Sequence, residues 1–170
     1  VRSLARPSRY HHEESEQRME VVRRRLEEMV AEQGSRRGAR RARAILKITS
    51  GLAESPGESV LHWFVRALGL PAPHLQMRIT DPDHLRLYFP DEAWPKYMVL
   101  VEFDGQVKYK SPEYLWREKR RHDALVRMGW RTERFIWDDF SNLSALRHRV
   151  MTLFPPATAR LWRPVADLWK

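Results

Sequence analysis

Three acidic residues stand around an apolar run in the middle of the chain. Asp91 precedes the segment YMVLVEF, residues 97–103, and Glu102 and Asp104 lie at its end. Because side chains alternate along a β-strand, Glu102 and Asp104 share one face of the predicted strand, one pleat apart. Asp91 belongs to the preceding strand, and the short connection at Pro95 lets that strand run back alongside. The sequence therefore predicts that three carboxylates converge.

Converging carboxylates repel one another unless a cation lies between them. Their oxygen atoms suit Mg²⁺, which keeps several waters and bridges readily to phosphate, and Mn²⁺ is expected to substitute for it. The alternative is that acids at strand ends are only solvated, with Asp104 and Gly105 forming a turn. The basic surface and the order of the elements favour the metal site.

The elements that would position these acids follow from the periodicity of apolar residues. Helical spacing predicts helices over residues 13–33, 35–49, 58–68, 112–128 and 138–154. Short β-type runs predict strands over residues 74–80, 84–89, 97–103 and 131–137. The last residues, 157–170, are expected to be a short packing segment. This order predicts an α/β (α+β) fold, a mixed sheet flanked by helices.

Composition limits the partners. The 170 residues include 31 Lys and Arg against 22 Asp and Glu, a formal net charge of +9, which favours nucleic acid as a partner. The absence of cysteine excludes disulfides and thiolate zinc sites. No apolar run reaches membrane-spanning length and no secretory signal is present, so we expect a cytoplasmic protein with no membrane partner. The first residue is Val1, which suggests that an upstream segment, such as a DNA-binding one, is missing.

Two predicted helices carry the basic residues. The helix over 35–49 has six basic side chains and no acid, which favours contact with a polyanion; they are Arg36, Arg37, Arg40, Arg41, Arg43 and Lys47. In the helix over 112–128, Lys119, Arg120 and Arg121 would position a phosphate backbone or form a solvated face. Arg134 lies in a β-type run, where it would face the acidic site or pair with a carboxylate.

The motifs ESPGES, VEFDG and GWRTERF occur together with PD at residues 90–91 and EFD at residues 102–104. In this combination the chain resembles the PD-(D/E)XK nuclease superfamily. Over residues 38–150 it is similar to endonuclease-like proteins related to the very short patch repair (Vsr-like) endonucleases. The resemblance implies a restriction-endonuclease-like core of order α-β-β-β-α-β-α over residues 51–156, after a basic helical extension over residues 1–50.

The resemblance also assigns roles. It places the first metal-binding acid at Asp91, the strand acid at Glu102 and a helix-borne acid at Glu58. The position of the family's final lysine holds Asp104 here, so Lys108, where relatives often have histidine, becomes the candidate for activating water. Glu58 has a structural alternative, because SPGE at residues 55–58 fits a capping box at a helix start.

The sequence therefore predicts a Mg²⁺-dependent endonuclease that hydrolyses DNA, with Asp91, Glu102 and Asp104 as metal ligands. Two alternatives remain open. One is a non-catalytic DNA-binding regulator, of the repressor or antitoxin kind, that keeps the nuclease fold; the other is an RNase toxin. One site cuts one strand, so double-strand cleavage would require a homodimer, for which the helix over residues 13–33 is the candidate contact.

Overall fold

The computed structural model of the chain describes residues 12–105 and 111–169. The chain forms two compact units, one made of Val1–Pro71 with Arg163–Lys170, the other of Ala72–Trp162. The domain boundaries expected from the sequence, after residues 50 and 156, stay predictions. In the part that the structure describes, no helix is both long and apolar enough to cross a membrane.

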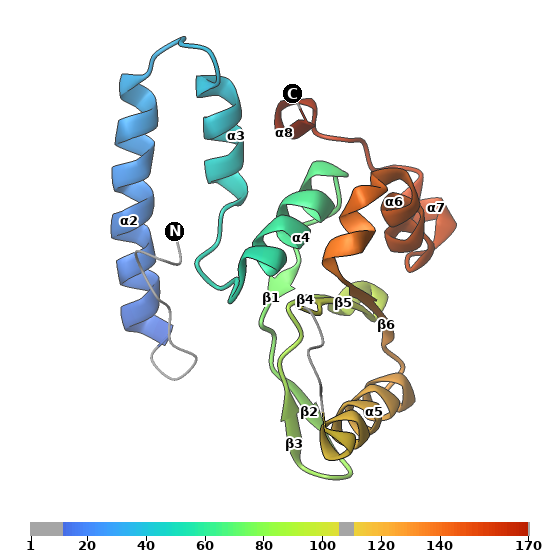
Figure 1. Cartoon of the computed structure of the whole chain (residues 1–170). Coiled ribbons are helices and arrows are strands. Elements are labelled where there is room, and N and C mark those ends of the chain that lie inside the picture. The colour runs from blue at the N-terminus through green and yellow to red at the C-terminus, as the bar shows by residue number, and fades with distance from the viewer. Residues whose placement is uncertain (1–11, 106–110, 170) are drawn as a thin grey trace. The chain divides into compact units, whose positions relative to one another are not determined.

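The first unit begins with two helices that lie side by side, α2 (His12–Glu32) and α3 (Ala39–Ile48) (Figure 1). Gly34 and Gly38 have φ values of +57° and +89°, the left-handed conformation that glycine adopts without strain, and they turn the chain between the helices. The predicted helix over 13–33 is confirmed. The second helix starts four residues later than expected because this turn takes up residues 33–38.

Helix α4 (Pro56–Ala67) and the short C-terminal helix α8 (Ala166–Trp169) complete this unit. The indole N–H of Trp63 donates to the Leu168 carbonyl at 3.1 Å, and that of Trp169 donates to the Ala67 carbonyl at 2.8 Å. The two indole rings lie edge to face, 5.2 Å apart. Their rings are half-buried and their indole N–H groups have acceptors, which fixes α8 on α4.

The second unit is built on a four-stranded mixed sheet of strand order β1-β4-β5-β6. Its strands are β1 (His74–Leu75), β4 (Glu92–Trp94), β5 (Val99–Phe103) and β6 (Arg131–Phe135). The 3-10 turn η1 (Pro95–Tyr97) reverses the chain, so β4 and β5 pair antiparallel. Helix α5 (Pro112–Arg127) lies between β5 and β6 in the chain, and these two strands pair in parallel. The mixed α+β class predicted from the sequence is confirmed.

The predicted strands over 74–80 and 84–89 differ from those observed. The first is divided, because Gln76 has a φ of +50° and ends β1 after two residues. The remainder, β2 (Ile79–Asp81), pairs only with β3 (Arg86–Tyr88), so the expected hairpin forms a separate two-stranded sheet. The strand that pairs with β5 is the three-residue β4, which the sequence pattern did not separate from its surroundings.

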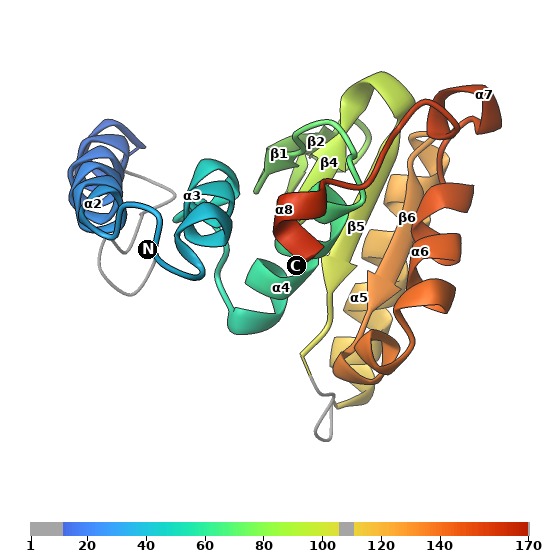
Figure 2. The same ribbon diagram turned by 90° about the horizontal axis from the view of Figure 1, so that it is seen from above.

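The sheet of the second unit carries a helix on each face, α5 on one side and α6 (Leu143–Thr152) on the other (Figures 1 and 2). A 3-10 turn, η2 (Trp137–Ser141), precedes α6, so the single helix predicted over 138–154 begins later than expected. Asn142 caps α6 by accepting from the Ala145 N–H at 3.0 Å. The short helix α7 (Pro156–Ala159) follows α6.

The face of the sheet toward α5 holds an apolar cluster. Ala93 and Leu100 of the sheet pack with Ala124 and Leu125 of α5 and with Tyr88 of the hairpin, and each is at least 90% buried. Because strand side chains alternate, Asp91 and Glu102 lie two residues from Ala93 and Leu100 on this same face. The apolar core between the sheet and α5 therefore continues directly into the predicted acidic site.

Candidate functional site

Asp91 and Glu102 are neighbours across the strand pair. The register joins Glu92 to Val101, and its continuation by one residue places Asp91 opposite Glu102. The Asp91 carboxylate accepts from the Phe103 N–H at 2.8 Å and from the Gln76 side-chain amide at 3.2 Å. These bonds hold Asp91 against the end of β5.

Glu102 is held by two arginines. The Arg121 guanidinium, from α5, donates to both oxygens of the Glu102 carboxylate, at 2.7 Å to Oε2 and through a second, shorter bond to Oε1. Arg134, from β6, approaches the same carboxylate at 3.4 Å. The Glu102 and Arg121 side chains are 14% and 19% exposed, so this pair lies largely out of water.

Arg134 joins the remaining acids of the site. Its guanidinium contacts Glu118 of α5 at 2.8 Å and Asp104 at 3.5 Å, besides Glu102. The Asp104 N–H donates to the Phe135 carbonyl at 2.7 Å, which extends the pairing of β5 and β6 past the strand ends. The two strands thereby place Asp104 and Arg134 at the same edge of the sheet.

Partial burial lowers the pKa of the Arg121 guanidinium, but the hydrogen bonds and negative charge of Glu102 more than offset this, and the pKa is raised overall. Burial likewise lowers the pKa of Arg134, and its bond to Glu118 with the charges of Glu102, Glu118 and Asp104 raises it. Both arginines therefore stay charged at every pH at which the protein folds.

The contacts of this group join four carboxylates, those of Asp91, Glu102, Asp104 and Glu118, to the guanidinium groups of Arg121 and Arg134. Carboxylate oxygens are the donors that Mg²⁺ and Mn²⁺ take, so the donor types suit the metal that the resemblance implies. Among the described residues, however, the three acids predicted as ligands do not bring their ligand atoms within 4.8 Å of one another. A cation therefore requires that Glu102 be shared with Arg121 or released from it.

Two other residues were predicted to be catalytic, Glu58 and Lys108. Glu58 belongs to the first unit, where the Ser55 hydroxyl accepts from the Glu58 N–H at 3.1 Å and the Glu58 carboxylate accepts from the Glu54 N–H. The first bond is the Ser55 cap of the structural alternative, and the Glu58 carboxylate returns to Glu54, one residue before the cap, rather than to Ser55 itself; together the two bonds start α4. Lys108 lies outside the residues that the structure describes.

The predicted nucleic-acid contacts divide into exposed and inward-facing residues. The six basic side chains of the segment before and along α3 are exposed; they are Arg36, Arg37, Arg40, Arg41, Arg43 and Lys47. Arg40 pairs with Asp167 at 2.8 Å, so the segment has one acidic neighbour that the local sequence did not show. On α5, Lys119 and Arg120 are exposed, whereas Arg121 turns inward to Glu102.

Comparison with known proteins identifies relatives without assigning an activity. The chain is 33% identical over 121 residues to two proteins of Mycobacterium tuberculosis, "Uncharacterized protein MT2308" of strain CDC 1551 / Oshkosh and "Uncharacterized protein Rv2248" of strain ATCC 25618 / H37Rv. The match covers 71% of this chain but only 44% of each relative. No family model and no solved structure matches the chain.

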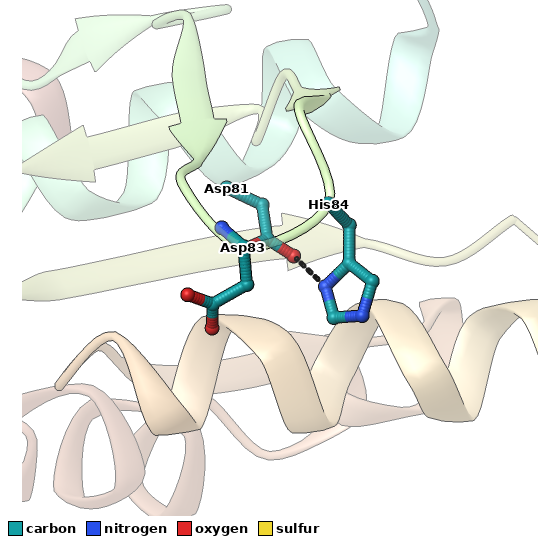
Figure 3. Close-up of side chains that lie close together, drawn as sticks. All are labelled: Asp81, Asp83 and His84. Carbon is teal, nitrogen blue, oxygen red and sulfur yellow. Dashed lines mark hydrogen bonds and ion pairs between the residues drawn. The ribbon is translucent and has the colours of Figure 1, made fainter.

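A second acidic group lies in the β2–β3 turn, formed by Asp81, Asp83 and His84 (Figure 3). Within the described part of the chain it is the group whose ligand atoms all lie within 4.8 Å of one another, the spacing a metal ion requires. Asp81 is buried, and its carboxylate accepts from the Asp83 N–H at 3.0 Å, lies 3.1 Å from His84 Nδ1, and is 3.3 Å from Arg127.

Burial raises the pKa of Asp81, but the hydrogen bond from the Asp83 N–H and the bond and charge of His84, with the charge of Arg127, outweigh it and leave the pKa below its ordinary value. The Asp81 carboxylate is therefore already satisfied by its own turn and by α5. These contacts indicate that the group stabilises the β2–β3 hairpin.

Sequence reasoning missed Gln76 and Glu118, which support Asp91 and Arg134. A signal for Glu118 was present. Glu118, Arg121, Leu125 and Met128 follow at spacings of three, four and three, which puts them on one face of a helix. Because Leu125 and Met128 are apolar and mark the packed face of this helix, the same spacing directs Glu118 and Arg121 inward. No comparable signal marks Gln76, whose role depends on the turn after β1.

Proposed function

We propose that the protein is a metal-dependent endonuclease that hydrolyses phosphodiester bonds of DNA. The observation that carries the proposal is the group formed by Asp91, Glu102 and Asp104, three acids from adjoining strand ends on the face of the sheet that α5 covers. The unit's order of β4, β5, α5 and β6 is compatible with a restriction-endonuclease-like core, in which such acids stand at the ends of adjacent strands.

In this proposal, Asp91, Glu102 and Asp104 hold Mg²⁺, which when bound polarises the scissile phosphate and lowers the pKa of a bound water. The arginines neutralise negative charge on the phosphate, because a guanidinium fork matches two phosphate oxygens. Glu118 holds Arg134 in place by its 2.8 Å contact. Lys108 remains the candidate for orienting the attacking water, a role taken from the resemblance alone.

DNA is the proposed substrate because the chain has a formal net charge of +9 and exposes basic side chains on α5 and along α3. Lys119 and Arg120 stand on the outer side of the helix that carries Arg121, where they can hold the phosphate backbone. The exposed basic residues of α3 supply a further, sequence-independent contact in the other unit.

A second candidate function is a DNA-binding regulator that has the fold but not the hydrolysis. The observation that favours it is the two-bond contact of Arg121 with Glu102, since an arginine that kept this position would compete with a metal ion for both oxygens. An RNase activity would use the same residues, and it is distinguished by substrate alone.

Incubation of the purified chain with supercoiled plasmid and Mg²⁺ or Mn²⁺ tests the proposal. The wild-type protein should nick the DNA, EDTA should stop the reaction, and Asp91→Ala and Glu102→Ala should each abolish it while DNA binding persists. Asp83→Asn, which removes an acid from the β2–β3 turn, is the matched control and should nick normally. A parallel assay on single-stranded and structured RNA separates the RNase alternative.

Binding without nicking by the wild-type chain would favour the regulator. Nicking that survives both alanine substitutions would come from a contaminant and would remove the support for the site.

A further inference from the structure

Arg121 is a largely buried counter-ion of Glu102. Its side chain is 19% exposed, its guanidinium lies 5.9 Å from the ring centre of Tyr88, and both of its hydrogen bonds go to Glu102. The next residues along its helix face, Ala124 and Leu125, are buried in the apolar core. Packing therefore keeps this guanidinium beside the acidic group even when its partner changes.

Arg121 and a divalent cation require the same atoms. The two oxygens of Glu102 receive both of the Arg121 hydrogen bonds, and a metal bound between Asp91 and Glu102 would draw on those oxygens. A guanidinium fork, however, fits a phosphate group as well as it fits a carboxylate. A phosphate placed at the site can therefore take over Arg121 while the metal takes over Glu102.

Arg134 is less suited to this exchange. It also contacts Glu118 at 2.8 Å and Asp104 at 3.5 Å, so it keeps partners whether or not Glu102 turns to a metal. Among the residues that the structure describes, the Arg121 hydrogen bonds go to Glu102 alone. The residue that responds to the metal and to the substrate is therefore Arg121.

We infer that Arg121 couples the binding of the metal to the binding of the nucleic-acid backbone, so that each ligand strengthens the other. The inference rests on the proposed function, because it takes Glu102 as a metal ligand. Without DNA the protein binds Mg²⁺ or Mn²⁺ weakly, since the cation must break the Arg121–Glu102 pair. With a phosphate present, the released guanidinium gains a new hydrogen-bond partner, and the Glu102 oxygens become available to the metal.

The test is Mn²⁺ binding to the full chain, measured by electron paramagnetic resonance at fixed ionic strength, with and without a phosphorothioate DNA duplex that resists hydrolysis. We expect the duplex to raise the Mn²⁺ affinity roughly 5-fold or more, and Mn²⁺ to raise the duplex affinity by the same factor, because such coupling is reciprocal. Arg121→Gln should raise the Mn²⁺ affinity of the free protein and bring the coupling factor close to 1.

Two further variants separate this effect from a general change in charge. Arg120→Gln removes the same charge from the adjacent, exposed position, and it should weaken duplex binding without changing the coupling factor. Arg121→Lys keeps the charge but loses the two-bond fork, so its coupling factor should lie between those of the wild type and Arg121→Gln. Circular dichroism melts confirm that each variant is folded.

Three outcomes overturn the inference. If Arg121→Gln binds Mn²⁺ more weakly, or keeps the wild-type coupling factor, Arg121 is not the counter-ion, although the nuclease proposal stands. If the wild-type chain binds no Mn²⁺ with or without the duplex, the metal site and the inference fail together. Coupling that is present in a protein that never nicks plasmid supports the inference and removes the nuclease proposal.

Discussion

The second unit holds two acidic groups that differ in what neutralises them. Asp81, Asp83 and His84 meet the spacing of a metal site, yet they come from one four-residue turn and bond to each other and to Arg127 of α5. Asp91 and Glu102 come from different strands, and the arginines beside Glu102 come from α5 and β6. The turn group is therefore held by one short segment and by Arg127, whereas the strand-end group of Asp91, Glu102 and Asp104 depends on elements that are far apart in the sequence.

The largest expected effect falls on the strand-end group. Glu102→Gln removes the charge for which Arg121, Arg134 and a metal compete, so Mn²⁺ affinity and nicking should both fall by more than the roughly 10- to 100-fold loss caused by removing an outer-shell partner. Titration with Mn²⁺ and the plasmid assay measure these losses. If Asp83→Asn abolishes Mn²⁺ binding instead, the turn is the metal site and the comparison is reversed.

The turn group should matter for stability. Asp81→Asn removes the charge that His84 and Arg127 face, and the buried amide cannot accept all the bonds that the carboxylate accepts. We expect the melting temperature to fall by roughly 5 °C, with Mn²⁺ binding unchanged. Thermal melts followed by circular dichroism test this, with the exposed neighbour Asp83→Asn as the control. An unchanged melting temperature would show that the Asp81 carboxylate does not stabilise the hairpin.

Low pH should distinguish the wild type from Asp81→Asn. The pKa of Asp81 is lowered in the folded state, so its charge contributes stability above its unfolded-state pKa of about 4, and this contribution is lost as the pH falls through the lower folded value. The wild type should therefore lose stability below about pH 4 more steeply than Asp81→Asn does. Urea unfolding at a series of pH values measures the difference, and parallel curves would contradict it.

The smallest effect concerns the exposed cations near the strand-end group. Lys119→Gln removes one backbone contact without touching the acids, so the slope of log affinity against log salt should shrink by about 1 while coupling to Mn²⁺ is kept. Fluorescence anisotropy with a labelled duplex at several salt concentrations gives the slope. A slope equal to that of the wild type would place the DNA elsewhere.

The long elements of the second unit were predictable because local signals agree with the fold. The apolar run that forms β5 is buried through its first three residues, and Ser111 with Pro112 starts α5, where the Ser111 hydroxyl accepts from the Tyr114 N–H at 3.3 Å. The short strands were not predictable in detail. Two residues form β1 and three form β4, and such strands exist only through pairing with distant residues.

The same distinction applies to the site. Asp91 and Glu102 could be placed opposite each other because a hairpin connection between their strands implies it. The inward position of Arg121 was missed because a run of basic residues on a helix usually faces water. In this run Lys119 and Arg120 are exposed, whereas Arg121 faces the acids. The charge balance of the site depends on Glu118 and Arg134, whose contacts are set by the crossing of α5 over β6.

The middle and the second half of α5 contact different parts of the unit. Its second half supplies Ala124 and Leu125 to the apolar core, and its middle supplies Glu118 and Arg121 to the acids. A motion that lifted α5 from the sheet would therefore expose apolar side chains and separate Arg121 from Glu102 in a single event. Substitutions that tighten the packing of α5 on the sheet should therefore also hold the Arg121–Glu102 pair more firmly in place.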